Sequence, residues 1–234
     1  PRFICAMNLM PFANYTDEQT LFQELVASDE NLNILLFHGE SGSGKSHLIE
    51  HCLKTHKTIP SVCMKLQSGS EAVPTLFNLM GRQCGWDHLP LFTRTIANLI
   101  EQPDRVSDPV WRIGIHRHLG DISKISDVES RLSRYQLLTD AWFADSMQFD
   151  SPLLLVVDTY ENASTLFDQW FCQDFLPGAA NSPKMRVLVG GKTVPELGES
   201  WSFCASLREL KGVQEAKAWL VWAEEAGYQI PSLE

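Results

Sequence analysis

The residues Gly39-Glu-Ser-Gly-Ser-Gly-Lys-Ser46 constrain the fold of this chain more than any other stretch. They match the pattern G-x-x-x-x-G-K-[ST] at every fixed position, and an apolar run precedes them while a helix-like pattern follows. A loop that wraps phosphate exposes several backbone N–H groups, and glycines leave room for that approach. The sequence therefore predicts a strand, a phosphate-binding loop, and a helix whose N-terminal dipole faces the same anion.

Each role predicted within this loop follows from side-chain chemistry. Lys45 reaches the β- and γ-phosphates of a nucleotide, and the hydroxyl of Ser46 is a ligand of Mg²⁺. The alternative, a glycine-rich turn that binds nothing, is disfavoured by the complete motif and its context. The predicted nucleotide-binding residues of the loop are Gly39, Glu40, Ser41, Gly42, Ser43, Gly44, Lys45, Ser46 and His47.

A second informative segment is Pro152-Leu-Leu-Leu-Val-Val-Asp-Thr-Tyr-Glu161. Its apolar, partly β-branched residues predict a parallel strand that is buried on both faces. An acid at the carboxyl end of such a strand lies where ligands bind in open α/β sheets. This is the Walker B arrangement, in which Asp158 holds Mg²⁺ and Glu161 polarises the attacking water. The alternative role of Glu161 is to cap a helix that begins near Ala163.

A small-residue corner follows another apolar segment, Met185 to Val189. It carries Lys192 and Thr193, and either side chain is suited to sense the γ-phosphate if this strand lies beside the Walker B strand. A plain turn is the competing interpretation. With Lys192 added to the binding set, the predicted catalytic residues are Lys45, Asp158 and Glu161, and the predicted metal ligands are Ser46 and Asp158.

Apolar segments near residues 34, 62, 153 and 186 alternate with helical patterns. This order predicts one doubly wound α/β domain over residues 1–234, a P-loop NTPase with three α/β/α layers and a mainly parallel central sheet. The distance between Lys45 and Asp158 requires another strand between the two motif strands, in space or in sequence. The predicted helices span 17–27, 72–84, 91–100, 128–147, a segment from 163 that breaks at Pro177-Gly178, and 213–226, and two further strands span 61–66 and 206–210.

Two parts of the chain are expected to form additions to the α/β core of this domain. Residues 1–30 predict an N-terminal segment and a helix that pack near the nucleotide base, with Pro11-Phe12 covering the base or forming a hydrophobic staple. Residues 86–130 predict a helical insertion. Inside it, Trp111-Arg-Ile-Gly-Ile-His-Arg-His118 alternates apolar and cationic residues, which predicts either an edge strand or a small solvated basic surface.

Composition excludes several classes of protein. A net charge of −10 argues against a general nucleic-acid-binding surface, and no apolar run reaches membrane-spanning length. The six cysteines lack C-x-x-C spacing, which favours reduced thiols and a cytoplasmic location. Three histidines, His47, His51 and His56, suggest a metal site, but no fourth ligand has suitable spacing, so solvated histidines are favoured.

The base specificity follows from a missing motif. GTPases use [NT]-K-x-D, in which the Asp takes both N–H donors of guanine. No Lys in this chain is followed two positions later by Asp. ATP or ADP, with Mg²⁺, is therefore the expected ligand.

Four segments together resemble a known family. They are Pro11-Phe-Ala-Asn-Tyr15 with Glu18, the segment Leu35 to Ser46, the segment Leu154 to Glu161, and Val187-Leu-Val-Gly-Gly-Lys192. These resemble the STAND class, which are signal-transduction ATPases related to the AAA+ ATPases. Leu207-Arg-Glu-Leu210 and the helix after it resemble the end of that ATPase core. The chain departs from the family at Tyr15 and Lys192, because the family usually carries Arg at both positions.

The resemblance implies a nucleotide-controlled switch with weak ATPase activity. Its implied partners are ATP, other domains of the same longer chain, and further copies of the chain in a nucleotide-dependent homo-oligomer. The start at Pro1 rather than Met fits a piece of a longer multidomain polypeptide. Two alternatives stay open: a DNA-associated AAA+ loader, suggested only by residues such as Arg112 and Arg117, and a P-loop kinase, which an absent arginine-rich lid disfavours.

Overall fold

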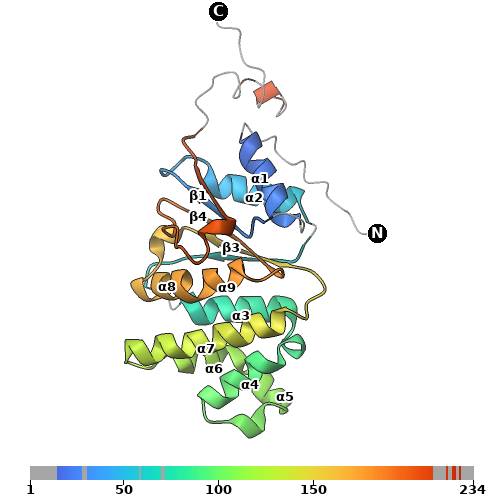
Figure 1. Ribbon diagram of the computed structural model, residues 1–234, viewed down its shortest axis with the longest axis vertical. Coiled ribbons are helices and arrows are strands. Elements are labelled where there is room, and N and C mark those ends of the chain that lie inside the picture. The colour runs from blue at the N-terminus through green and yellow to red at the C-terminus, as the bar shows by residue number, and fades with distance from the viewer. Residues whose placement is uncertain are drawn as a thin grey trace, which may run out of the picture.

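The computed structural model describes residues 15–27, 31–57, 59–69, 72–212, 220, 223–224 and 227. Its centre is a five-stranded parallel sheet with the order β2-β3-β4-β1-β5 (Figure 1). The strands are β1 (Ile34–His38), β2 (Ser61–Lys65), β3 (Leu153–Asp158), β4 (Met185–Gly191) and β5 (Ala205–Glu209). Because β4 lies between β1 and β3, the strand expected between the two motif strands is confirmed.

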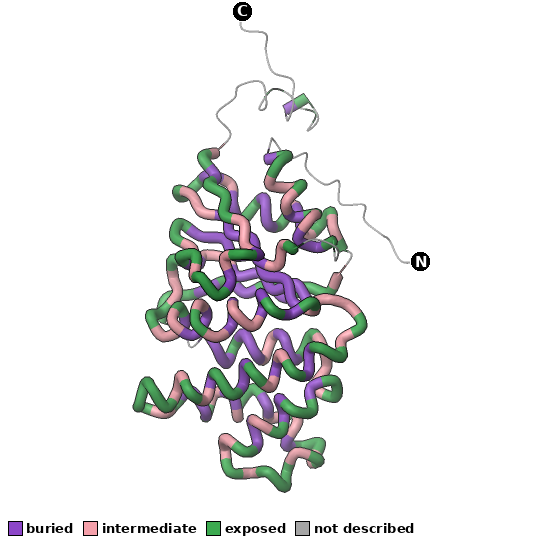
Figure 2. Tube along the Cα trace, in the orientation of Figure 1, coloured by how far each residue is buried: buried purple, intermediate pink, exposed green. Residues whose placement is uncertain are grey.

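Alternate residues of the strands face two separate cores, since side chains of a strand point to opposite faces. Leu35 and Phe37 of β1 pack with helices α1 (Thr16–Val26) and α2 (Lys45–Thr55). Ile34 and Leu36 face the other core, which includes α3 (Ala72–Cys84), α8 (Thr165–Trp170) and α9 (Leu176–Ala180). Figure 1 shows these helices on the two sides of the sheet, and Figure 2 shows the burial concentrated in the strands. The predicted three-layer α/β/α fold is confirmed.

Residues 86–146 add a helical layer beneath α3, far from the loop between β1 and α2 (Figure 1). Its helices are α4 (Pro90–Leu99), α5 (Pro109–Ile113), α6 (Ile115–Ser123) and α7 (Val128–Ser146), joined by 3₁₀ turns at Trp86–His88 and Pro103–Arg105. Aromatic rings tie the layer to the core, with Phe92 packed edge-on against Trp142 at 5.8 Å between ring centroids. The added layer is therefore continuous with the main core.

The edge strand considered for Trp111–His118 is wrong, because this stretch forms α5 and α6. Asp108 caps the first of these helices by accepting a hydrogen bond from the backbone of Val110. The buried residues Trp111, Ile115 and Leu119 then recur every four positions, which is a helical period. Ile113 looked like part of a two-residue alternation but is 79% exposed.

The break predicted at Pro177-Gly178 is also wrong. A π-helical turn, Phe171–Phe175, joins α8 directly to α9, and Pro177 lies in the first turn of α9. Proline is tolerated in the first turn of a helix, and the π-helical turn before it changes the hydrogen-bond spacing from i−4 to i−5. The widened turn thus lets the helical path continue through a residue that normally ends it.

The remaining differences between the predicted and the observed elements concern where helices start and which residues the structure describes. Helix α8 is capped by Ser164, whose hydroxyl accepts from Phe167 N, so Glu161 is not a helix cap. Helix α1 begins at Thr16 with Tyr15 as its cap position, one residue earlier than expected. The motif residues Pro11 to Asn14 and most of the helix predicted at 213–226 lie outside the described residues. Among the residues that are described, no helix combines the length and hydrophobicity needed to span a membrane.

Candidate functional site

The Gly39–Ser46 loop connects β1 to α2 at the carboxyl edge of the sheet. Its tight path depends on glycine at two points. Gly44, the cap of α2, has φ +91°, a conformation that side chains resist. A Cβ on Gly39 would lie 2.3 Å from the carbonyl oxygen of Leu210, so the segment after β5 packs directly on the start of the loop.

Lys45 is the first residue of α2, and its side chain closes back over the loop. The ammonium donates hydrogen bonds to the carbonyl oxygens of Gly39 (2.6 Å) and Glu40 (2.8 Å) and to Ser43 Oγ (3.2 Å). Only 8% of Lys45 is exposed, so the loop keeps this cation within the site. An ammonium held in this way places positive charge beside the loop N–H groups, where a phosphate would lie.

Ser46 and Asp158 come from segments far apart in sequence and meet at the same edge. The Ser46 hydroxyl donates to Asp158 Oδ1 at 3.2 Å, and Thr159 N donates to the same oxygen at 2.8 Å. These are hard oxygen atoms of the kind that Mg²⁺ prefers, and Mg²⁺ usually keeps several of its waters beside one or two protein ligands. The donor set therefore fits the predicted Mg²⁺ ligands.

Glu161 lies in a 3₁₀ turn, Tyr160–Asn162, just beyond β3. Its Oε2 accepts a hydrogen bond of 2.9 Å from the backbone N–H of Lys192, which follows β4. The Lys192 ammonium lies 3.7 Å from Glu40 Oε2, although both side chains are largely exposed. The ends of β3 and β4 and the loop after β1 thus share one set of polar contacts.

Most of the residues predicted from sequence line one cavity of about 300 Å³. Sequence analysis missed Thr159 and Gly191, which also line it, whereas the alternative sensor Thr193 does not. Gly191 had a signal: a small residue ends a buried strand beside the Walker B strand. Gly39, Glu40 and Ser43 do not line the cavity; they hold Lys45 instead. The full lining is Ser41, Gly42, Gly44, Lys45, Ser46, His47, Asp158, Thr159, Glu161, Gly191 and Lys192.

A larger cavity, about 420 Å³, lies elsewhere, between the added helical layer and the start of β3. Its buried carboxylate, Asp145, already accepts hydrogen bonds from the backbone N–H groups of Leu91 and Phe92 and so caps α4. The carboxylate therefore has a structural role. The smaller cavity is the stronger functional candidate because Lys45, Asp158 and Glu161 converge on it.

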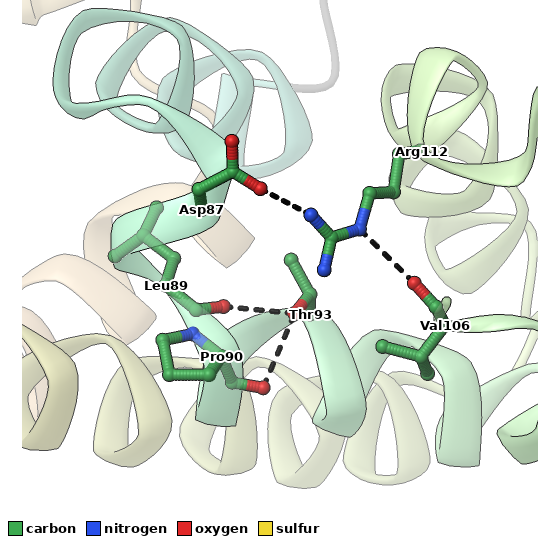
Figure 3. Close-up of polar contacts among 6 residues, drawn as sticks. All are labelled: Asp87, Leu89, Pro90, Thr93, Val106 and Arg112. Atoms are coloured by element: carbon green, nitrogen blue, oxygen red, sulfur yellow. Dashed lines mark hydrogen bonds and ion pairs between the residues drawn. The ribbon is translucent and has the colours of Figure 1, made fainter. Parts of the chain in front are cut away.

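The cations of the Trp111–His118 stretch are partly engaged with their own fold. Figure 3 shows Arg112 between the carboxylate of Asp87 and the carbonyl of Val106, and its Nε donates to that carbonyl at 3.0 Å. Arg134 donates to the carbonyl of Leu99 at 2.9 Å. In the part of the chain that the structure describes, no group of three or more His, Cys, Asp or Glu residues could hold a metal, so His47, His51 and His56 form no such site.

Comparisons with known proteins add a likeness of fold. No family model matches the sequence, and no curated protein matches it. One solved structure with a similar chain path is "Structure of Drosophila ORC bound to AT-rich DNA and Cdc6", at a TM-score of 0.43 and 12% identity. The match covers 83% of this chain and 55% of that chain. This chain therefore spans only about half the length of that chain.

Proposed function

We propose that this domain binds ATP with Mg²⁺ and hydrolyses it slowly, as the switch module of a STAND-type signalling ATPase. The observation that carries the proposal is the 3.2 Å contact between Ser46 Oγ and Asp158 Oδ1 beside the buried ammonium of Lys45. Two oxygen ligands for a metal and one cation for phosphate converge on one cavity. The sequence resemblance to the STAND class supports the signalling role.

The proposed chemistry divides among four side chains. Lys45 would neutralise phosphate charge, while Ser46 and Asp158 would hold a Mg²⁺ ion, which would offset further negative charge of the phosphates. Glu161 lines the same cavity, and its proposed role is that of the general base that orients a water molecule. Its Oε2 is already hydrogen-bonded to the Lys192 amide, which supports slow turnover. Contacts with other domains of a longer chain and a nucleotide-dependent homo-oligomer belong to the same proposal.

Nucleic acid is not part of the proposal. Arg112 and Arg134 are already bound to groups of the protein, and the chain carries a net charge of −10. Binding to a phosphate backbone draws on clustered cations that are free to replace counterions. No described feature of the site favours DNA over a nucleotide.

The test is thermal unfolding of the 234-residue chain with and without Mg-ATP. A ligand present at 100 times its Kd stabilises the folded state by about 2.7 kcal/mol, which is a measurable rise in Tm. Lys45→Ala should abolish this rise. Glu161→Gln should keep the rise and block phosphate release, because glutamine still accepts the Lys192 hydrogen bond but is not basic.

The matched control is Lys54→Ala. Lys54 lies on the same helix, α2, but pairs with Glu50 on the exposed face and does not reach the cavity. This variant should keep the full Tm rise. A wild-type chain whose Tm is unchanged by Mg-ATP would refute the proposal, as would a Lys45→Ala variant that binds as tightly as Lys54→Ala.

A further inference from the structure

Tyr15 has an unusual backbone conformation directly behind the phosphate-binding loop. Its φ is +66° and ψ 35°, the left-handed region, which is a real outlier for a bulky side chain. Such a conformation is strained and persists only where the surroundings enforce it. The side chain is 9% exposed and packs in the same core as α1 and α2. The position of this tyrosine is therefore set by contacts that outweigh the backbone strain.

The hydroxyl of Tyr15 makes two hydrogen bonds to backbone groups from distant segments. It donates to the carbonyl of Ser43 at 2.7 Å and accepts from the N–H of Gly212 at 2.9 Å. Burial raises the pKa of Tyr15, so the hydroxyl keeps the proton that it donates. One phenol oxygen thus joins the start of α1, the phosphate-binding loop and the segment after β5.

The contact with Ser43 sets the orientation of one peptide group of the loop. No described peptide bond is cis, and in a planar trans peptide the C=O and the next N–H point in opposite directions. When Tyr15 holds the Ser43 carbonyl, the N–H of Gly44 must therefore point away from Tyr15. Gly44 lines the cavity and Tyr15 does not, so the loop lies between the tyrosine and the cavity.

Apart from this anchor, the described hydrogen bonds of Ser43 engage its N–H, with Glu40, and its hydroxyl, with Lys45; neither of them holds its carbonyl. Gly44 has no Cβ, and a Cβ placed there would meet the Tyr15 ring only at 3.7 Å, an ordinary contact. Gly44 also tolerates many backbone conformations. A rotated peptide would present a carbonyl oxygen to an anion in place of a donor. The tyrosine hydroxyl is the side-chain group that opposes this rotation.

The contact with Gly212 extends the same anchor to the segment after β5. Leu210 N donates to the carbonyl of His38 at 2.7 Å, immediately before the loop begins. Leu210 also packs on Gly39, as described above. The segment Leu210–Gly212 therefore runs along the outside of the loop, and Tyr15 binds both. The Tyr15 hydroxyl therefore joins this segment to the loop at Ser43.

We propose that Tyr15 is a positioning residue for phosphate binding: it holds the Ser43 carbonyl outward so that the Gly44 N–H faces the cavity. The inference rests on the proposed function, since it assigns a further residue to the same site. It predicts that phosphate binding, rather than contacts to the base, depends on the hydroxyl. It also predicts that nucleotide binding alters the Gly212 amide.

The decisive variant is Tyr15→Phe, which keeps the ring and removes both hydrogen bonds. We expect its Kd for Mg-ATP and for inorganic tripolyphosphate to rise by roughly 10-fold, the effect of losing a preorganised charge-assisted hydrogen bond. Calorimetric titration measures both values. Tyr135→Phe is the control, because it removes a buried phenol hydroxyl from α7, in the added helical layer (Figure 1). Its Kd should stay within twofold of wild type.

A second measurement uses the unaltered chain and does not depend on how the variant folds. In ¹⁵N-resolved NMR spectra, tripolyphosphate should shift the amides of both Gly44 and Gly212. Wild-type binding of ATP with an unchanged Kd in Tyr15→Phe would overturn this inference and leave the proposed function intact. Unmoved Gly44 and Gly212 amides at saturation would also overturn it. A wild-type chain that binds neither ligand would instead refute the proposed function.

Discussion

Backbone strain in the described residues gathers around the candidate site. Three non-glycine residues there have positive φ: Tyr15, Glu101 and Thr159. Tyr15 lies behind the phosphate-binding loop, and Thr159 lines the cavity itself. Strained conformations of this kind cost energy and are held in place by the surrounding contacts. Thr159 is held by its hydroxyl, which donates to the carbonyl of Leu66 at 2.9 Å.

The residue after Thr159 provides a second anchor for the turn that carries Glu161. Tyr160 is 4% exposed, and its hydroxyl donates to Asp168 Oδ1 at 2.6 Å. Burial raises the pKa of Tyr160, so it stays a donor. This bond ties the 3₁₀ turn to α8. The position of Glu161 therefore depends on a hydrogen bond that is made one residue away from it.

Tyr160→Phe tests this dependence. We expect the turnover of ATP to fall roughly 10-fold while its Kd is unchanged, because small displacements of a catalytic group are costly to rate. The loss of the hydrogen bond should lower the free energy of unfolding by about 1 kcal/mol. Phosphate release and calorimetric binding are measured on the same preparation, with Tyr135→Phe as control. A variant with wild-type turnover would show that the turn holds Glu161 without Tyr160.

At the scale of elements, close packing depends on small residues inside helices. Gly81 of α3 lies against the ring of Trp86, and an added Cβ would come within 2.0 Å of Trp86 Cζ3. Gly178 of α9 has the same relation to Phe143, with a clash at 2.2 Å. Both rings belong to the added helical layer, so the two glycines permit α3 and α9 to approach that layer closely.

Replacing either of two helical glycines by alanine should change the free energy of unfolding, and the two changes should have opposite signs. Gly81→Ala should destabilise the chain by about 1–3 kcal/mol, because the Trp86 ring would have to move in a packed core. Gly120 of α6 has no atom within 4 Å of its added Cβ, so Gly120→Ala should stabilise by about 0.5–1 kcal/mol through helix propensity. Chemical denaturation measures both values. The same sign for both variants would contradict this account of the packing.

At the scale of the whole molecule, two histidines link stability to pH. His51 lies on α2, beside the sheet, and His118 lies on α6, in the added helical layer. Burial is the main cause that lowers both pKa values, and nearby cationic groups add to it. For His118, a hydrogen bond with the Trp111 backbone and the charge of Asp121 oppose the lowering of the pKa without cancelling it. His118 stacks on Trp111 at 4.8 Å, and its Nε2 is buried with no hydrogen-bond partner among the described residues. Protonation of Nε2 would place an N–H donor at this buried position without a described acceptor.

The sign of the pH effect follows from linkage. Between the lowered folded-state pKa and the ordinary value near 6.5, the unfolded chain binds more protons than the folded chain. The free energy of unfolding should therefore fall as pH falls from 7.5 to 5.5. His118→Phe keeps a ring on Trp111 but does not titrate, so denaturation at both pH values should show a smaller fall for this variant. An equal or larger fall would exclude His118 as a cause.

Much of the fold was predictable because short stretches of sequence specify its strands and the loop between them. The apolar segments around Leu35 and Val156 have the length and composition of buried parallel strands, and the loop motif orders the strand before it and the helix after it. The helical insertion was harder. Ile113 and Ile115 suggested a strand because a short apolar pattern fits both the two-residue period of a strand and the 3.6-residue period of a helix. The helix cap at Asp108 decides for the helix.

The sequence by itself determined the chemical inventory of the site: Lys45, Ser46, Asp158 and Glu161 are marked by motifs whose spacing is local. Only the tertiary structure showed that Gly191 lines the cavity and that Tyr15 bonds to the loop. Tyr15 reaches Ser43 and Gly212, which lie 28 and 197 positions away along the chain, and no local pattern encodes such a contact. Local motifs specify which groups are available; the parallel sheet brings strand ends together at one edge and so specifies which groups meet.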